Sequence, residues 1–260
     1  MLEVLAEIGQ ISLGSLYSVV LVFVRVGAMV SLLPGFGEQS LPARVRLAAA
    51  IAFTVLVWPI IAPDLNTLPN SFEALIPMML TEAIVGLGFG VVIRMTVMAL
   101  QLTGSIAAQA TSLAQIMGAG ATPDPLPAIG NILIMAGLAL ALAAGLHIKA
   151  VLTIAATFEI FPLGAVPEAG DFAEWGVMRA SSAFALAFTL AAPFVIASFA
   201  YNLALGVINR AMPQLLVAFI GAPAITAFGI LILLTGGPII LTVWVGHLDQ
   251  ILSDPFRPAE

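Results

Sequence analysis

The sequence predicts an all-α integral membrane protein, and its composition and the pattern of its apolar residues support this fold class. Of its 260 residues, 61% are hydrophobic and only 8% are charged, against about 25% charged residues in a typical soluble domain. Because so few ionic groups cannot cover the surface of a soluble protein, the apolar residues must face lipid or partner subunits. These residues also gather in about six runs, most of them long enough to cross a bilayer as helices.

The first two runs are separated by helix-breaking residues. The first covers about 11–33 and stops before Pro34, because proline lacks the backbone N–H that a continuing helix needs. The second covers about 47–61 and is closed by Pro59 and Pro63. It is barely long enough to span a bilayer.

The four later runs are longer, covering about 74–100, 128–160, 178–205 and 215–245. A helix of about 30 residues extends about 45 Å, whereas the hydrocarbon core is about 30 Å thick. We therefore expect kinked helices, hairpins, or helices shielded by protein rather than by lipid. The break points predicted from proline are Pro77, Pro193, Pro223 and Pro238.

The organisation of the chain is simple. Glu3 and Glu7 precede the first run and no basic residue precedes Arg25, whereas a cleaved signal peptide needs a positively charged start. The first helix is therefore expected to be retained. No repeat of fixed period and no low-complexity linker is visible, so we expect residues 1–260 to form a single membrane domain.

Ionisable side chains inside the apolar runs are the first candidate functional residues: Arg25, Glu82, Arg94, Lys149 and Glu159. A charge at a helix centre costs roughly 2.5–3.5 kcal/mol on insertion scales, so each must face protein or water. A proton or ion relay, a structural pair and a contact between subunits are the alternatives. No second acid lies near Arg25, Glu82 or Arg94 in the sequence, which favours a structural role. Lys149 and Glu159 lie near one end of a run, where an interfacial position is also possible.

Small residues recur at a spacing that suits close helix packing. Residues 86–90 contain glycine at every second position, including a GxxxG pattern, and Gly137, Ala141 and Gly145 repeat the four-residue spacing. Without side chains in the way, another backbone can approach such a face. The sequence therefore predicts tight helix contacts along these two stretches.

The stretch from Gln101 to Pro127 is polar and small rather than charged. Irregular backbone at membrane depth is tolerated where it lines a cavity or pore, and the flexible side chain of Met117 can pack against varied neighbours. A pore-lining or plugging segment and an ordinary exposed loop are the alternatives. The candidate pore residues are Gln109, Met117, Gly118 and Gly120.

Several function classes find no support in the residues. The chain has no cysteine, and neither His147 nor His247 has a carboxylate or second histidine three or four residues away. We therefore expect no metal site and no cofactor. The motifs of nucleophilic, phosphate-binding and zinc enzymes are missing, so we expect no enzyme. Basic residues occur one or two at a time, which excludes a nucleic-acid-binding patch.

The stretch Tyr201–Ala224, YNLALGVINRAMPQLLVAFIGAPA, resembles the FliR/SctT family of type III secretion export-gate subunits. Asparagine and glycine precede an arginine, followed by Pro-Gln and a hydrophobic stretch to Ile-Gly-x-Pro. The matching positions, which the resemblance assigns to assembly, are Asn202, Gly206, Arg210, Pro213, Gln214, Gly221 and Pro223. Further matches run through nearly the whole chain.

The resemblance implies a non-enzymatic subunit of the flagellar protein export gate. In that family, a single copy joins FliP-like and FliQ-like subunits in a spiral assembly that forms a closed pore for unfolded proteins. It implies FlhA-like and FlhB-like export components as further partners, and a place in the bacterial inner membrane within the flagellar basal body. It also implies that residues 106–123 form part of the plug. A virulence type III secretion gate subunit and a proton- or solute-coupled secondary transporter are the alternatives.

Overall fold

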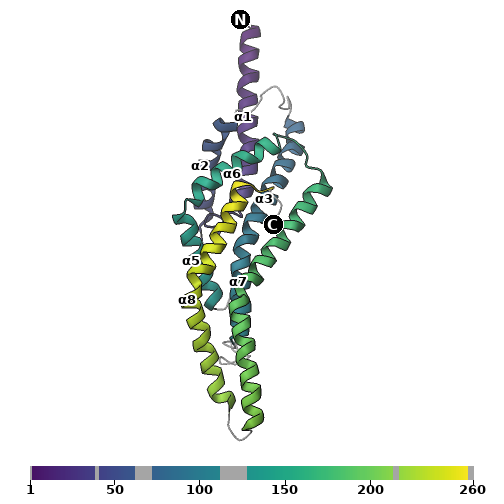
Figure 1. The fold of residues 1–260 in the computed structure, drawn as a ribbon. Coiled ribbons are helices and arrows are strands. Elements are labelled where there is room, and N and C mark those ends of the chain that lie inside the picture. Colours follow the sequence, from purple (N-terminus) through teal and green to yellow (C-terminus); the bar gives the residue numbers. More distant parts are fainter. Residues whose placement is uncertain (1, 39–40, 62–71, 112–127, 213–216, 257–260) are drawn as a thin grey trace. The chain divides into compact units, whose positions relative to one another are not determined.

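Seven helices and no strand occur in the residues that the computed structural model describes, which are 2–38, 41–61, 72–111, 128–212 and 217–256. Of these, residues 2–13, 72 and 217–222 are described by their backbone alone. The helices are α1 (Leu2–Val30), α2 (Ala43–Ile61), α3 (Phe72–Ala110), α5 (Ala128–Ala143), α6 (Leu146–Ile160), α7 (Ala169–Ala211) and α8 (Val217–Ser253) (Figure 1).

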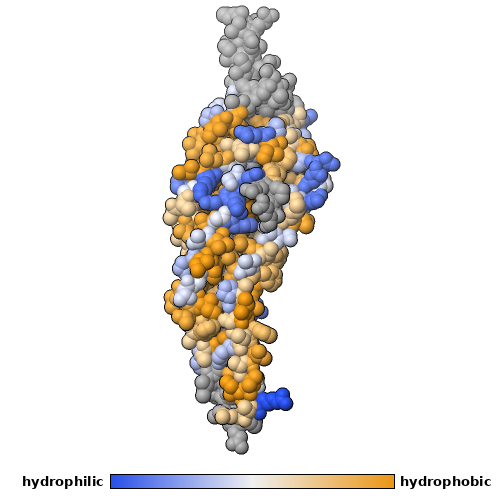
Figure 2. Space-filling model, in the orientation of Figure 1, coloured by the Kyte–Doolittle hydropathy of each residue, from blue (hydrophilic) through white to orange (hydrophobic). Residues whose placement is uncertain are grey.

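The helices have the length and composition of membrane spans. Within the described residues, α2, α3, α7 and α8 are each long and apolar enough to cross a bilayer, and α5 with α6 gives a fifth, broken span. Most of the face seen in Figure 2 is coloured as hydrophobic. The predicted all-α integral membrane fold is confirmed, and each of the six predicted runs coincides with helical structure.

The predicted fourth run is not one helix, because the chain breaks at Gly145. Gly145 has a left-handed backbone with φ of 83°, a conformation that costs glycine nothing but strains residues with a Cβ. The carbonyl of Gly145 accepts from the N–H groups of Ile148 (3.0 Å) and Lys149 (3.2 Å), which starts α6. The glycine thus ends one helix and begins the next.

None of the prolines at the predicted break points ends a helix, because the helices continue through them. Pro77 lies inside α3, Pro193 inside α7, and Pro223 and Pro238 inside α8. A proline removes one backbone hydrogen bond, and neighbouring helices and hydroxyl side chains make that loss tolerable in membrane helices. Pro59 likewise lies inside α2.

The chain divides into two compact units, each assembled from separate stretches. Unit 1 contains residues 1–94, 144–179 and 249–260. In it, the Trp58 indole N–H of α2 donates to the Ser18 hydroxyl of α1 (2.9 Å). Leu21 of α1 and Leu75 of α3 share a buried apolar cluster.

Unit 2 contains residues 95–143 and 180–248. The buried indole N–H of Trp244 on α8 donates to the Thr96 carbonyl of α3 (2.6 Å). The Thr103 hydroxyl of α3 donates to the Ala187 carbonyl of α7 (3.2 Å). Uncharged hydrogen bonds to backbone carbonyls therefore join the helices of this unit.

Candidate functional site

Arg25 of α1 and Glu82 of α3 form a fully buried ion pair in unit 1. Arg25 Nε lies 2.6 Å from Glu82 Oε2, and both side chains are 0% exposed. Arg25 Nη1 also donates to the carbonyl oxygens of Thr157 (3.0 Å) and Phe161 (2.8 Å). The centroid of the Phe158 ring lies 3.9 Å from the guanidinium carbon of Arg25, a distance at which the ring quadrupole attracts the cation.

The remaining oxygen of Glu82 is also engaged. Glu82 Oε1 accepts a hydrogen bond from the backbone N–H of Gly164 (2.7 Å). Arg25 thus binds two backbone carbonyls at the end of α6: that of Thr157, which also accepts from the Phe161 N–H (2.9 Å), and that of Phe161, just after the helix. We call Arg25, Glu82 and their contacts at residues 157–164 the Arg25 knot. It joins α1, α3 and the end of α6.

The chemistry of the Arg25 knot favours a structural role, in which it attaches α1 to α3 and to the end of α6. A buried ion pair is tolerated only when hydrogen bonds satisfy its remaining polar atoms. Glu82 meets this condition with both oxygens, whereas Arg25 Nη2 has no partner among the described atoms. The geometry thus fits the structural pair among the three alternatives. A relay role for these residues stays untested.

Two of the other three candidate charges, Arg94 and Lys149, are paired as well, at half-exposed positions of unit 1. Arg94 Nη1 lies 2.5 Å from Glu38 Oε1, and Lys149 Nζ lies 2.7 Å from Asp249 Oδ1. Neither acid was predicted as a partner, since each is distant in the sequence. Glu159 is exposed on α6.

Glycines admit close helix contacts, as predicted for residues 86–90. A Cβ on Gly86 would overlap the Arg25 carbonyl of α1, and one on Gly90 would crowd Leu32. Sequence reasoning missed a second crossing, in unit 2, where a Cβ on Gly104 of α3 would overlap the backbone of Gly130 of α5. Both glycines are visible in the sequence, but their pairing is not.

The start of the predicted pore segment is helical, which corrects its prediction as irregular. Residues 101–110 form the last turns of α3, and Gln109 is exposed there. Hydroxyls bond back to the helix, as when Ser105 donates to the Gln101 carbonyl (3.0 Å), so the polar residues do not interrupt it. Met117, Gly118 and Gly120 lie outside the described residues.

The described residues of the predicted assembly motif lie on α7 and α8. Asn202, Gly206 and Arg210 are exposed on α7, and Pro223 is exposed on α8. Gly221 lies in the first turns of α8. The motif residues outside the described part are Pro213 and Gln214.

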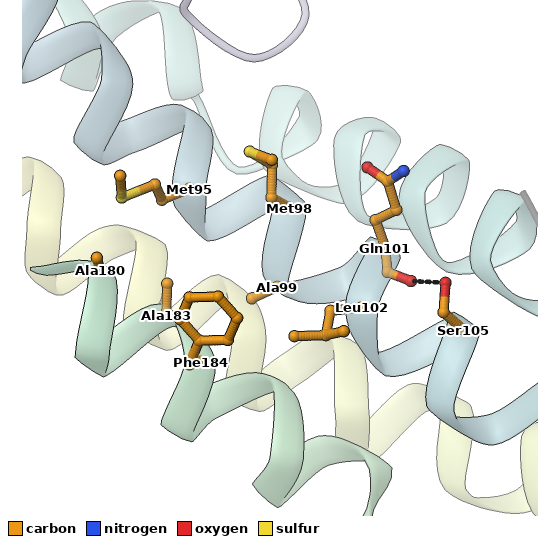
Figure 3. A pocket seen from close by; sticks show the side chains of 9 residues that line it. All are labelled: Met95, Met98, Ala99, Gln101, Leu102, Ser105, Ala180, Ala183 and Phe184. Atoms are coloured by element: carbon orange, nitrogen blue, oxygen red, sulfur yellow. Dashed lines mark hydrogen bonds between the residues drawn. The ribbon is translucent and has the colours of Figure 1, made fainter. Parts of the chain in front are cut away.

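A groove of about 470 Å³ runs between α3 and α7 within unit 2 (Figure 3). Its lining is mostly apolar and includes Met98, Leu102 and Phe184. Gln101 and Ser105 are its polar residues. The groove can accommodate an apolar segment and offers no acid, base or nucleophile pair. Across the described residues, no cluster of three or more His, Asp or Glu side chains could hold a metal ion.

Comparison with known proteins gives the family. The family of bacterial export proteins, family 1, matches residues 16–251. Flagellar biosynthetic protein FliR of Caulobacter vibrioides is 30% identical over 238 residues, covering 91% of this chain and 95% of the relative. FliR of Bacillus subtilis is 30% identical over 231 residues, covering 86% and 87%. FliR of Escherichia coli is 28% identical over 222 residues, covering 83% and 82%. The chain therefore belongs to family 1 of the bacterial export proteins, as the resemblance to FliR/SctT subunits predicted.

Proposed function

We propose that this protein is a non-enzymatic subunit of the flagellar type III protein export gate. With FliP-like and FliQ-like subunits it forms the closed pore through which unfolded flagellar proteins leave the cell. FlhA-like and FlhB-like components are its further partners, and the assembly lies in the inner membrane within the basal body. The names of the FliR relatives support the flagellar over the virulence system.

One observation carries this proposal: the longest helices exceed the bilayer. α3, α7 and α8 have 39, 43 and 37 residues, which corresponds to about 55–65 Å at 1.5 Å per residue. A hydrocarbon core about 30 Å thick covers roughly half of such a length unless the helix is strongly tilted. The other half needs cover from protein if it is apolar.

The C-terminal end of α7 is largely exposed, and large apolar side chains follow one another along it. Near the C-terminal end of α7, Phe199, Leu203 and Val207 are 71%, 62% and 64% exposed, and nearly all residues from 202 to 212 are exposed. Asn202 and Arg210 are exposed there too, but a row of exposed large apolar side chains marks contact with another protein or with lipid. Because the helix is too long for lipid alone, we assign this part of α7 to contact with partner subunits.

The alternative of a coupled transporter lacks a matching observation. Such a transporter uses ionisable groups at the membrane midplane, on broken helices of paired repeats. Arg25 and Glu82 are instead held in the Arg25 knot, and Arg94 and Lys149 each have an acidic partner.

Within this proposal, residues 106–123 contribute to the plug of the resting pore, through Gln109 and the undescribed Met117, Gly118 and Gly120. Deletion of residues 112–123 should raise ion leakage across the membrane of cells that express the complete gate. A matched control replaces the same residues by a Gly/Ser segment of equal length, which should leak as well if side chains close the pore. Unchanged conductance in both strains would contradict the plug.

Gene deletion with complementation tests the function as a whole. Cells without this chain should stop exporting hook and filament proteins and lose motility, and the intact chain should restore both. Co-expressed FliP-like and FliQ-like subunits should copurify with it in one complex. Undiminished export after deletion would refute the proposal, as would a stable solitary chain that moves a small solute.

A further inference from the structure

The short segment after α8 is bound by unit 1 through polar contacts. α8 ends at Ser253, and the Pro255 carbonyl then accepts two hydrogen bonds, from Trp175 Nε1 (2.8 Å) and Arg179 Nη2 (2.7 Å). Both donors lie on α7 and are buried. Two convergent donors, one of them cationic, make a specific site for a single carbonyl oxygen.

Asp254 and Phe256 fix the conformation on either side of that carbonyl. The Phe256 N–H donates to Asp254 Oδ1 (3.2 Å), which closes a tight turn of the kind that aspartate favours. The Asp254 N–H donates back to the Gln250 carbonyl (3.0 Å), and the Asp254 carboxylate attracts Arg179. The segment is thus held in one shape as well as in one place.

The Phe256 ring enters a group of aromatic rings. Its centroid lies 5.3 Å from that of Phe89 on α3, 5.9 Å from Phe161 after α6, and 5.3 Å from Trp175 on α7. Phe172 of α7 packs in turn on Phe161 (6.2 Å) and Trp175 (5.3 Å). Centroid distances of 4.5–7 Å are those at which aromatic pairs attract one another.

We infer that Phe89, Phe161, Phe172, Trp175 and Arg179 form an intramolecular binding site for the segment Asp254–Phe256, which acts as a clasp. The ligand that this site selects is a backbone carbonyl followed by an aromatic side chain. Once bound, the clasp fixes the last turn of α8, where Leu252 accepts from Thr153 (2.6 Å) and Asp249 pairs with Lys149 (2.7 Å). The clasp therefore connects α3, α6, α7 and α8 within unit 1.

Chains of three lengths test this site in detergent extracts, with an N-terminal tag and with thermal unfolding as the readout. A chain that stops after Ser253 loses the clasp, whereas a chain that stops after Phe256 keeps it and is the matched control. We expect the first to lose roughly 4 °C or more in Tm and the second to match the full chain. Equal Tm values for all three chains would overturn the inference.

A coupling measurement separates specific binding from general weakening. Trp175→Phe keeps an aromatic ring but removes the donor to Pro255, so it should lower the Tm of the full chain more than that of the chain ending at Ser253, in which Trp175 still packs on Phe89 and Phe172. Equal effects in both backgrounds would show that Trp175 does not act through the clasp. Should the short chain not be recovered, Phe256→Ala in the full chain takes its place, with Phe256→Tyr expected to keep the wild-type Tm.

Discussion

The helices within unit 1 and the helices within unit 2 are joined by different kinds of contact. Unit 1 contains every one of the 8 basic and 14 acidic residues except Asp124 and Arg210, and it holds the ion pairs described above: Arg25 with Glu82, Arg94 with Glu38, and Lys149 with Asp249. Unit 2 joins its helices by a glycine crossing and by uncharged hydrogen bonds to carbonyls.

The difference shows how an apolar sequence can specify its helix contacts in two ways. A buried ion pair is highly directional, and removing one partner leaves an uncompensated charge. A glycine crossing is specified by shape alone, because a backbone fits only where no side chain stands. Unit 1 should therefore be sensitive to loss of charge, and unit 2 to gain of volume.

The largest expected effect is from Glu82→Ala in unit 1. This substitution leaves the Arg25 guanidinium buried without its anion, which costs about 3–5 kcal/mol. We expect the chain to be degraded or unfolded, as measured by its steady-state amount in membranes and by its Tm.

A double substitution provides the control for this result. Arg25→Met with Glu82→Met removes both charges at similar volume, and such replacements are often close to neutral. The double variant should recover part of the lost amount in membranes, although the Phe161 carbonyl and the Gly164 N–H lose their partners in the knot and the Thr157 carbonyl keeps the Phe161 N–H alone. If Glu82→Ala alone left the Tm unchanged, the Arg25 knot would not stabilise unit 1.

Added volume at the glycine crossing of unit 2 should have the next largest effect. A Cβ at Gly104 would overlap the backbone of Gly130, and such overpacking typically costs about 1–3 kcal/mol. Gly104→Ala should therefore lower the Tm. Gly246→Ala on α8 is the matched control, because nothing lies within 4 Å of its Cβ, and it should leave the Tm unchanged or slightly raised. Equal Tm changes in the two variants would contradict the proposal that the helix packing of unit 2 depends on shape.

Ser198→Ala tests the uncharged hydrogen bonds of unit 2. The Ser198 hydroxyl of α7 donates to the Ala110 carbonyl at the end of α3 (2.5 Å), and a neutral bond of this kind contributes about 0.5–1.5 kcal/mol. A Tm loss of a few degrees is expected. Thr189→Ala is the control, since its hydroxyl bonds only to Ala185 within the same exposed turn (2.8 Å); a loss as large as that of Ser198→Ala would contradict the assignment.

The smallest expected effect is at the half-exposed pair of Lys149 and Asp249. Exposed ion pairs contribute about 0–1 kcal/mol, and salt screens them. Asp249→Asn should therefore change the Tm little at low salt and not at all at high salt. A Tm loss as large as that of Glu82→Ala would mean that this half-exposed ion pair stabilises unit 1 as much as the buried pair does.

Sequence reasoning predicted the parts of the fold that depend on local composition. The apolar runs coincide with helices, and Gly86 and Gly90 admit α1 as their spacing predicted. The break at Gly145 was missed because the φ of a glycine is set by its neighbours in space, which the sequence does not show. Proline does give a local signal in the sequence, but the helices continue through the prolines. The partners Glu38, Asp249 and Gly130 were also missed, since they are brought together only by the packing of helices from separate stretches.

The Arg25 knot and the clasp could also be predicted only in part from the sequence. The apolar surroundings of Arg25 and Glu82 predicted buried charges, but nothing in the sequence paired them. The carbonyls of Thr157 and Phe161 carry no sequence signal at all, because every residue has a carbonyl. The clasp contains an Asp-Pro turn signal, yet its aromatic site is assembled from three separate stretches: α3, the residue after α6, and α7.

The central claim is that the overlong apolar helices are covered by other subunits, and site-directed photo-crosslinking tests it most directly. A photoreactive residue at Phe199, 71% exposed on α7, should crosslink to a FliP-like or FliQ-like subunit in cells that assemble the gate. The same residue at the fully buried Phe194 should crosslink only within the chain. Crosslinks from Phe199 to lipid alone, in cells with an assembled and secreting gate, would contradict the account.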